Sequence, residues 1–122
     1  MWFFMAALLT YFAYFKGWIF ADFENISPHK AHTLLSSPNK IILIDVRSSK
    51  AFEKDHLKGA RHIPLSEVDS REIRDSELIV YSERGEDSVE AARILSARGY
   101  AVWNLEGGVV FWIRAGYEVV DK

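Results

Sequence analysis

The strongest constraint on the fold is one apolar, β-branched run, Ile41-Ile42-Leu43-Ile44-Asp45-Val46. It lacks the alternation of polar and apolar residues seen in a half-exposed strand, so it predicts a strand buried on both faces. Such strands are typical of parallel sheets, in which a helix connects consecutive strands. Strand and helix patterns do alternate from Asp22 onward. The sequence therefore predicts an α/β domain with a central, mainly parallel sheet covered by helices on both faces.

The other expected elements are short. Further strands are expected within residues 23–26, 59–64, 78–81 and 101–105. Helices are expected after Ser27, after Ser48 or Ser49, as one turn over residues 65–68 with Ser66 as a cap, from residue 87 or 88 to residue 98, and over residues 109–115. The charged residues 69–77 are expected to form a solvated connector with a helical tendency.

Residues 78–92 predict a functional loop. A short apolar strand is followed by a loop containing Gly85, and Asp87 or Ser88 then caps a helix, with Asp87 and Glu90 spaced as in a capping box. A strand, a tight loop and a helix N-terminus together form a cradle of backbone N–H groups that suits an anion. Ser82 follows the strand and is expected at the bottom of this cradle.

Short motifs along the chain resemble, in order, those of the rhodanese-like domains, and the resemblance covers residues 23–120. The motifs are Ile44-Asp45-Val46-Arg47; Phe52 followed by His56-Leu57-Lys58-Gly59-Ala60; His62-Ile63-Pro64-Leu65; Ile79-Val80-Tyr81; Ala91-Ala92; Gly99-Tyr100; and Asn104-Leu105-Glu106-Gly107-Gly108 with Trp112 and Ala115-Gly116-Tyr117. The resemblance implies a three-layer α/β domain with an active-site loop at the carboxyl end of a central strand. It also implies structural roles for Asp45, Arg47, His56, Gly59, Gly107, Gly108 and Trp112. Asp45 and Arg47 are expected to tie the sheet to neighbouring loops through charge-assisted hydrogen bonds.

The same resemblance assigns the active-site-like loop to residues Ser82, Glu83, Arg84, Gly85, Glu86, Asp87 and Ser88. In active members this loop begins with a cysteine, which carries sulfur as a persulfide. The matching residue here is Ser82, whose oxygen cannot form the required sulfur–sulfur bond and whose hydroxyl is far less acidic than a thiol. Active members also usually carry loop arginines, whereas this loop has one arginine against three carboxylates, a net charge of −2. The nucleophile and the anion-attracting field are both expected to be missing, so no catalytic residue is assigned.

Other chemistries have little support. The chain has no cysteine, which excludes disulfides, thiolate metal sites and cysteine nucleophiles. Ser82 has no histidine beside it to act as a base, which disfavours a hydrolase, and a phosphatase of this fold would need its own cysteine. His29 and His32 are the one close histidine pair and are interpreted as part of a solvated helix face, so neither a metal nor a cofactor is expected. The net charge of −2, without a basic stripe, argues against a nucleic-acid partner.

Residues 1–21 form an apolar segment that is predicted to be a transmembrane helix, followed by the domain over residues 22–122. No charged residue precedes Lys16, and a helix over residues 2–21 would be about 30 Å long, which matches a bilayer core. Trp2 and Trp18 stand near its two ends, where membrane-interface aromatics occur. The alternatives are a signal peptide, a helix on the membrane surface and a helix packed on the domain. Lys16 lies near the C-terminal end of the segment, Lys30 follows it, and no Lys or Arg precedes them, so the positive-inside rule predicts a single-pass protein with its domain in the cytoplasm.

The sequence therefore predicts a membrane-anchored, rhodanese-like domain that lacks sulfurtransferase activity and is a binding or scaffold module. Its partner is expected to be a protein, with a basic surface that complements the acidic loop. The alternatives are an active or weakly active sulfurtransferase, an engineered Cys-to-Ser form of one, and a purely structural domain of a membrane complex. Glu86 and Asp87 favour natural loss over engineering, because one engineered change would not also have removed the arginines.

Overall fold

The computed structural model describes residues 23–38, 40–74 and 77–121. The strands are β1 (Glu24–Ile26), β2 (Ile41–Asp45), β3 (Arg61–His62), β4 (Glu77–Tyr81) and β5 (Ala101–Leu105). The helices are α2 (Pro28–Ser36), α3 (Ser49–Lys54), the 3-10 turn η1 (Leu65–Glu67), α4 (Glu86–Ala97) and α5 (Gly108–Arg114). The predicted transmembrane segment, residues 1–21, lies outside the described residues. Within the described ranges, no helix has both the length and the apolar character needed to cross a bilayer.

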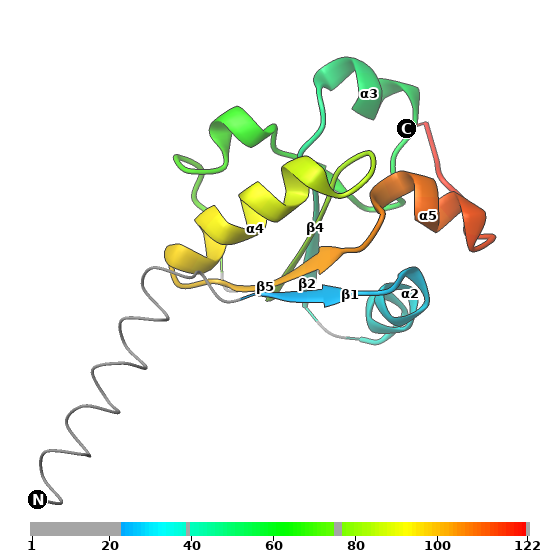
Figure 1. The fold of residues 1–122 in the computed structure, drawn as a ribbon, viewed down its shortest axis with the longest axis horizontal. Helices are drawn as coiled ribbons and strands as arrows, with labels where there is room; N and C mark the ends of the chain where they lie inside the picture. Colours follow the sequence, from blue (N-terminus) through cyan, green and yellow to red (C-terminus); the bar gives the residue numbers. More distant parts are fainter. Residues whose placement is uncertain (1–22, 39, 75–76, 122) are drawn as a thin grey trace, which may run out of the picture.

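The five strands form one sheet in the order β1-β5-β4-β2-β3, and all four pairings are parallel (Figure 1). The strand predicted from the run of residues 41–46 is β2, which lies inside the sheet between β4 and β3. The prediction of an α/β domain with a central parallel sheet is confirmed. β1 and β3 are the two edge strands, with three and two residues.

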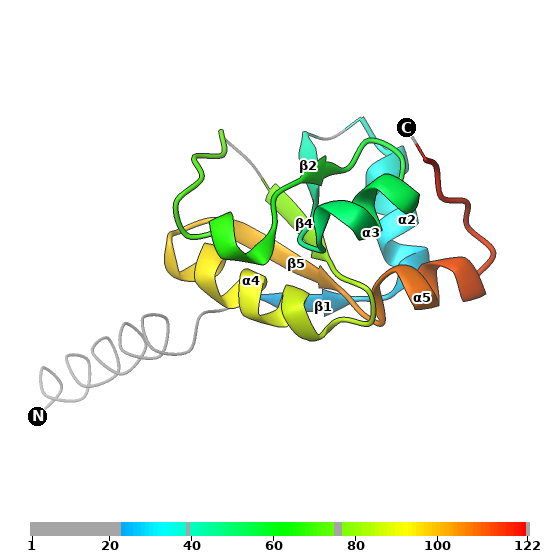
Figure 2. The same ribbon diagram turned by 90° about the horizontal axis from the view of Figure 1, so that it is seen from above.

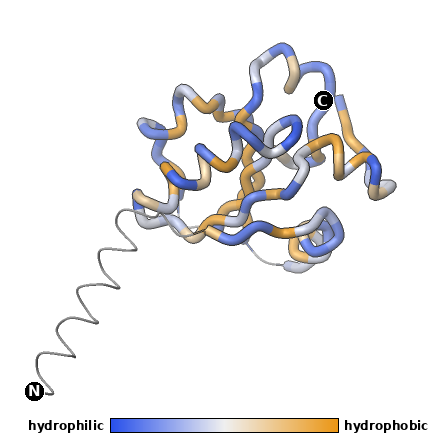
Figure 3. The backbone as a smooth tube through the Cα atoms, viewed as in Figure 1, coloured by the Kyte–Doolittle hydropathy of each residue, from blue (hydrophilic) through white to orange (hydrophobic). Residues whose placement is uncertain are grey.

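Helices cover both faces of this sheet (Figure 2). In β4, Leu78 and Val80 point to one side, where they pack with residues of α4 and of the segment after η1. Ile79 and Tyr81 point to the other side, where they pack with α2 and α5. Because successive residues of a strand face opposite sides, an unbroken apolar strand supplies two cores at once. Figure 3 shows the resulting hydrophobic centre of the fold.

Local capping explains where α2 and α3 begin and where α4 ends. The Ser27 side chain accepts a hydrogen bond from the Lys30 amide, and Pro28 occupies the first turn of α2, as predicted. The Ser48 side chain caps α3 in the same way. The predicted Ser66 cap is wrong, because η1 is a tight 3-10 turn that begins after Pro64 and has no side-chain cap. Gly99 follows the end of α4 with φ of 99°, in agreement with the predicted glycine stop.

The predicted helical tendency of residues 69–77 is also wrong. The described part of this connector has no helix, and Glu77 already belongs to β4. Ile73 is buried, and its amide donates to the Tyr100 hydroxyl over 3.2 Å. Arg98 donates from Nη1 to the carbonyls of Val68 and Arg71, both over 2.8 Å. Contacts with distant residues therefore fix the connector, and these override its weak helical propensity.

The order of the strands creates a topological switch point between β2 and β4. The chain leaves β2 toward the edge strand β3, but it leaves β4 in the opposite direction, toward β5. Ligands of open α/β sheets bind at such a switch point, outside the carboxyl ends of the two strands. Asp45 and Tyr81, the last residues of β2 and β4, are paired across it. The residues that follow each of them, including Arg47 and Ser82, therefore meet at this point.

Candidate functional site

The loop after β4 is tighter than the sequence predicted. We use the name "82–88 loop" for residues 82–85 together with the first residues of α4, up to residue 88. Gly85 is the N-cap of α4 with φ of 104°, so the helix already begins at Glu86. The predicted cap at Asp87 or Ser88, and with it the capping box with Glu90, is wrong. Glycine adopts this left-handed backbone conformation without steric strain, so the chain enters the helix directly after Gly85, before the residues that were predicted to cap it.

The Ser82 hydroxyl accepts the hydrogen bonds that a capping side chain would otherwise accept at the start of α4. Its oxygen accepts hydrogen bonds from the amides of Gly85, over 3.0 Å, and of Ser88, over 3.3 Å. These are N–H groups that the first turn of a helix leaves without intrahelical partners. Ser82 is only 2% exposed. The N–H cradle expected from the sequence is therefore present, and the serine oxygen itself fills it.

The proton of this hydroxyl has no base to go to. Ser82 donates to Oγ of Ser88 over 3.1 Å, and Ser88 donates in turn to the Gly85 carbonyl over 3.2 Å. Among the described residues, neither a histidine nor a carboxylate is a hydrogen-bond partner of Ser82. A serine nucleophile needs such a partner to remove its proton. The geometry thus does not support serine-based hydrolysis.

The start of α5 holds the loop from the other side. The amides of Val109 and Val110 donate to the carbonyls of Ser82 and Glu83, over 3.0 and 3.2 Å. Gly108 permits this approach, because a Cβ atom there would lie 2.2 Å from the Ser82 carbonyl oxygen. Figures 1 and 2 both show α5 beside the loop that leads into α4. Gly107 and Gly108 therefore allow the N-terminus of α5 to pack against the loop that leads into the N-terminus of α4.

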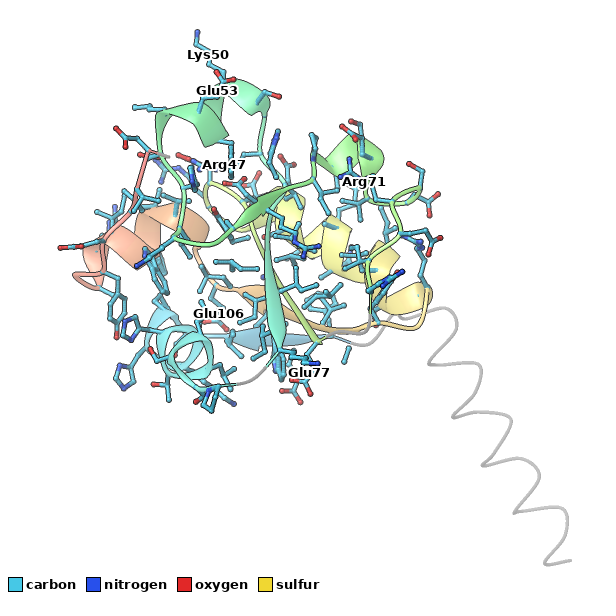
Figure 4. All side chains as sticks on the ribbon, turned by 180° about the vertical axis from the view of Figure 1, so that it is seen from behind. Arg47, Lys50, Glu53, Arg71, Glu77 and Glu106 are labelled. Atoms are coloured by element: carbon cyan, nitrogen blue, oxygen red, sulfur yellow. The ribbon has the colours of Figure 1, made fainter. Side chains whose placement is uncertain are left out.

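Arg47 joins the end of β2 to α3 and to the 82–88 loop. Its Nε and Nη2 form a bidentate ion pair with Asp45, with distances between 2.8 and 3.1 Å. Nη2 also donates to the Asp55 carbonyl, while Nη1 donates to Oδ1 of Asp55 over 3.3 Å and to Oε1 of Glu83 over 3.0 Å. All five N–H donors of the guanidinium are thus used. Figure 4 shows Arg47 beneath α3, whereas Lys50 and Glu53 of α3 project outward.

Electrostatics keep Arg47 charged although it is only 6% exposed. Burial alone would lower its pKa, but the hydrogen bonds and charge of Asp45, with a further hydrogen bond from Glu83, more than offset burial and raise it. One guanidinium nevertheless faces three carboxylates, those of Asp45, Asp55 and Glu83. Arg47 therefore supplies no surplus positive charge to a ligand.

Two hollows lie over this arrangement. One, of about 440 Å³, is lined by Arg47, Ser48, Ala51, Lys54, Asp55, Glu83 and Asp87. The other, of about 150 Å³, lies directly over Ser82 and is lined by Ser82, Glu83, Arg84, Glu86 and Asp87. The second is smaller than the roughly 300–1,000 Å³ typical of small-molecule sites. Arg84, Glu86 and Asp87 are exposed, so the mouth of the site carries more negative than positive charge.

Comparison with known proteins identifies the family. Residues 27–115 match the rhodanese-like domain family, which is most of the chain. The chain belongs to this family. Its relatives include a tRNA sulfurtransferase of Desulfurococcus amylolyticus, 36% identical over 96 residues, which are 78% of this chain and 19% of that protein. They also include the uncharacterized protein YqhL of Bacillus subtilis, 42% identical over 77 residues, covering 60% of this chain and 61% of YqhL.

Relatives that match over most of their own length carry enzyme names. The thiosulfate sulfurtransferase GlpE of Pseudomonas putida is 31% identical over 102 residues, which cover 80% of this chain and 90% of GlpE. Among solved structures, a rhodanese-related protein of Thermoplasma volcanium has a TM-score of 0.75 at 25% identity, over 82% of this chain and all of that one. A rhodanese-like domain protein of Staphylococcus aureus, at 20% identity, shares the fold with a TM-score of 0.72, over 81% of this chain and 98% of that one. This rhodanese-like domain is therefore related to sulfurtransferases.

The other motif residues of this rhodanese-like domain lie away from Ser82. His56 is buried, its ring contacts the Phe52 carbonyl over 2.9 Å, and its backbone pairs with Val120 in both directions over 2.8 Å. Gly59 adopts φ of 83° in the turn that follows. Trp112 is 5% exposed, and its indole N–H donates to the Glu118 carbonyl over 3.0 Å. These contacts hold the C-terminal segment against the domain.

His29 and His32 have more specific surroundings than the predicted solvated face. Both are exposed, but Nδ1 of His29 lies 2.9 Å from the Tyr117 hydroxyl, and the His32 ring stacks on the Tyr117 ring with centroids 4.2 Å apart. They therefore connect α2 to the C-terminal segment of the rhodanese-like domain. Within the part of the chain that the structure describes, no three His, Asp or Glu side chains are grouped as a metal site would need.

Sequence reasoning missed several residues of the site. The sequence assigns Ser88 to the active-site-like loop and Tyr81 to a family motif, but it predicts no hydrogen-bonding role for either, and it does not single out Asp55. Tyr81 is fully buried at the end of β4, and its hydroxyl accepts from the Leu57 amide over 3.1 Å. Its position opposite Asp45 follows from the strand register, which no local pattern in the sequence encodes. No sequence pattern marks Asp55 as a site residue, because it reaches Arg47 only as a result of the course that α3 takes in the fold.

Proposed function

We propose that this rhodanese-like domain lacks sulfurtransferase activity and is a binding or scaffold module, held at a membrane by residues 1–21. The observation that carries the proposal is the state of Ser82. The family resemblance puts this residue at the position of the sulfur-carrying cysteine, and here the position holds a buried hydroxyl. Two amides and Ser88 engage that hydroxyl. An oxygen atom at this point cannot carry sulfur as a persulfide.

The charge around Ser82 supports the same conclusion. The anionic donors of sulfur transfer require a positive field, which a helix N-terminus of about half a unit charge supplies only when it is not opposed. Three carboxylates in the 82–88 loop oppose the N-terminus of α4 here, and Arg47 is already saturated by its own partners. An anion that approaches Ser82 therefore meets repulsion.

The exposed carboxylates favour a protein partner with a basic surface. Glu86 and Asp87 are exposed on the first turn of α4, while the Glu83 side chain is 57% exposed although it is paired with Arg47. Because the partner's positive charges would meet largely solvated acids, the contact weakens with salt, over the Debye length of about 8 Å at physiological ionic strength. Charge of this kind governs the association rate and the choice of partner more than it governs affinity.

Attachment to the membrane is proposed from the sequence pattern of residues 1–21 alone. In this proposal the segment is a single transmembrane helix, and the domain is on the cytoplasmic side. The acidic loop is then presented to partners near or at the membrane surface.

Sulfur transfer tests the catalytic half of the proposal. Purified protein is incubated with thiosulfate or mercaptopyruvate and with cyanide as the acceptor, and thiocyanate is measured. We expect turnover no higher than that of Ser82→Ala, a matched control that removes only the hydroxyl. Turnover clearly above this control would contradict the proposal.

Titration followed by NMR tests the binding half. The amides of residues 83–88 are observed while sulfate, thiosulfate or a basic peptide is added, at low and at high salt. We expect saturable shifts with the peptide, weaker at high salt, and none with either anion. Saturable sulfate binding below millimolar concentration, without a response to the peptide, would contradict the proposal and show that the loop binds anions.

The second candidate is a rhodanese-type sulfurtransferase, weakly active or inactivated by a Cys-to-Ser change at residue 82 alone. The specific observation in its favour is that position 82 still receives two backbone N–H groups, the arrangement that lowers the pKa of a thiol at a helix N-terminus. In that case a single substitution at residue 82, natural or engineered, would be the whole difference from an active enzyme. Ser82→Cys separates the two candidates, as described in the Discussion.

A further inference from the structure

An exposed aromatic ring borders the 82–88 loop. Phe111 of α5 is 48% exposed, unusually high for a large hydrophobic side chain, and Ile113 is similar at 47%. The two residues are two positions apart, about 200° around the helix, so they face different directions. They do not form one apolar patch, and each needs an explanation of its own.

The glycines at the start of α5 place the Phe111 ring near the loop. A Cβ atom at Gly107 would lie 2.0 Å from Cγ of Phe111, so the ring lies directly against that glycine. The Gly107 amide nitrogen is 3.4 Å from the position that a Cβ atom would take at Gly85, the N-cap of α4. The ring therefore lies against a glycine whose backbone is close to the N-cap of α4.

A guanidinium already occupies the ring face. Cζ of Arg114 lies over Phe111, 5.8 Å from the ring centroid, within the range of a cation–π contact. Arg114 and Phe111 are both exposed, so solvent and other molecules have access to the pair. An exposed contact of this kind is weak, and an arginine from another molecule can replace Arg114.

We propose that Phe111, together with the acids Glu86 and Asp87 that follow Gly85 in the first turn of α4, forms a binding surface for an arginine side chain of a basic protein segment. The inference rests on the proposed function, in which the 82–88 loop binds a basic partner, and it names the side chain that is recognised. The carboxylates attract the positive charge, and the ring takes the flat face of the guanidinium in place of Arg114. Arginine is favoured over lysine because its planar, weakly hydrated head group stacks on aromatic rings.

The experiment compares two probes on the full-length protein in detergent micelles. The probes are an oligo-arginine peptide and an oligo-lysine peptide of equal length, and binding is followed at the amides of residues 83–88 and at the Phe111 ring. We expect both peptides to shift the loop amides, but only oligo-arginine to shift the ring. Oligo-arginine should bind roughly two- to fivefold more tightly, the scale of an exposed cation–π contact.

Variants assign that preference to the ring. Phe111→Leu keeps an apolar side chain without a π face and should abolish the preference for arginine. Ile113→Ala, on the same helix and equally exposed, should leave it unchanged. Arg114→Gln should increase it, because the ring face becomes vacant. Phe111→Leu also controls for any loss of packing against Gly107, since it keeps most of the side-chain volume.

The outcomes separate this inference from the proposed function. Equal affinity for the two peptides, or a preference that survives in Phe111→Leu, would overturn the arginine surface and leave a basic partner of the loop intact. If neither peptide shifts the amides of residues 83–88, the proposed function fails and the inference fails with it. A preference lost in Phe111→Leu, retained in Ile113→Ala and enhanced in Arg114→Gln supports the inference.

Discussion

Oε1 of Glu83 lies 3.0 Å from Nη1 of Arg47, so the segment after β4 is joined to the segment after β2 by an ion pair between residues 36 positions apart. The two partners differ in their exposure to solvent. The Arg47 side chain is 5% exposed and the Glu83 side chain 57%. Removing one or the other should therefore have very different consequences.

Arg47→Met should be far more destabilising than Glu83→Gln. The first substitution leaves the buried Asp45 carboxylate without its cation, which costs about 3–5 kcal/mol when a buried pair is broken. The second removes a largely solvated partner, and we expect a loss below about 1 kcal/mol. Urea unfolding of the two variants measures both values. Equal losses would show that Glu83, rather than Asp45, is the main partner of Arg47.

Ser82→Cys should give little sulfur transfer by itself. The two amides favour a thiolate at this position, but the carboxylates of Glu86 and Asp87 still repel anionic donors. Turnover should appear only when Glu86→Arg and Asp87→Arg are added, as measured by thiocyanate formation from thiosulfate and cyanide. Full turnover of Ser82→Cys alone would instead favour the second candidate, in which the replacement of sulfur by oxygen at residue 82 is the sole cause of the lost activity.

Gly108→Ala should disturb the site, whereas Gly59→Ala should only cost stability. Both glycines have positive φ, 58° and 83°, so each alanine carries the strain of the left-handed region, about 1–2 kcal/mol. A Cβ atom at residue 108 would also meet the carbonyls of Ser82 and Glu83, while one at residue 59 would have no heavy atom within 4 Å. In NMR spectra we expect the amide signals of residues 82–88 to shift in Gly108→Ala and to stay unchanged in Gly59→Ala. Similar spectra for the two variants would contradict the close contact between the start of α5 and the 82–88 loop.

Stability should fall at alkaline pH because of Tyr81. Burial raises the pKa of its hydroxyl, and the charge of Asp45 raises it further. Above about pH 10, Tyr81 of the unfolded chain loses its proton while the folded chain keeps it, so the unfolded state binds fewer protons and the free energy of unfolding falls. Below that pH both states are protonated, and Tyr81 contributes no pH dependence. Unfolding measured from about pH 9 to 11 should show a smaller decline in Tyr81→Phe than in the parent. Equal slopes would contradict this.

The membrane prediction is tested by fractionation. If residues 1–21 span a bilayer, the full-length protein stays with membranes through an alkaline carbonate wash. A protein that begins at Asp22 should instead be recovered in the supernatant and unfold cooperatively, because it retains every element that the structure describes, from Glu24 onward. Release of the full-length protein by carbonate would count against the anchor. A truncated protein that aggregates would indicate that the apolar segment packs on the domain.

The fold was predictable where the local pattern is strong. The unbroken run of residues 41–46 has no period-two alternation, so only a strand buried on both faces accommodates it, and β2 is such a strand. Ser27-Pro28 likewise marks the start of α2 by local chemistry alone. These signals depend on neighbours in sequence, which is why they can be read without a structure.

The site was less predictable because its contacts are not local. The start of α4 depends on the positive φ of Gly85, and this outweighed a capping-box pattern two residues later. Arg47 and Glu83 meet only because β2 and β4 are adjacent in the sheet. His29 and His32 face Tyr117, which lies near the other end of the chain. No window of sequence contains both members of such pairs.

The clasp between α5 and the 82–88 loop separates what holds the loop from what the loop displays. The hydrogen bonds between α5 and the loop join backbone amides to backbone carbonyls, and Gly108 gives them room. Within the loop, the small hydroxyls of Ser82 and Ser88 make the remaining hydrogen bonds. The exposed positions 84, 86 and 87 can therefore change in charge while the backbone keeps its course. A lineage could exchange sulfur chemistry for partner recognition in a few substitutions, without passing through an unfolded intermediate.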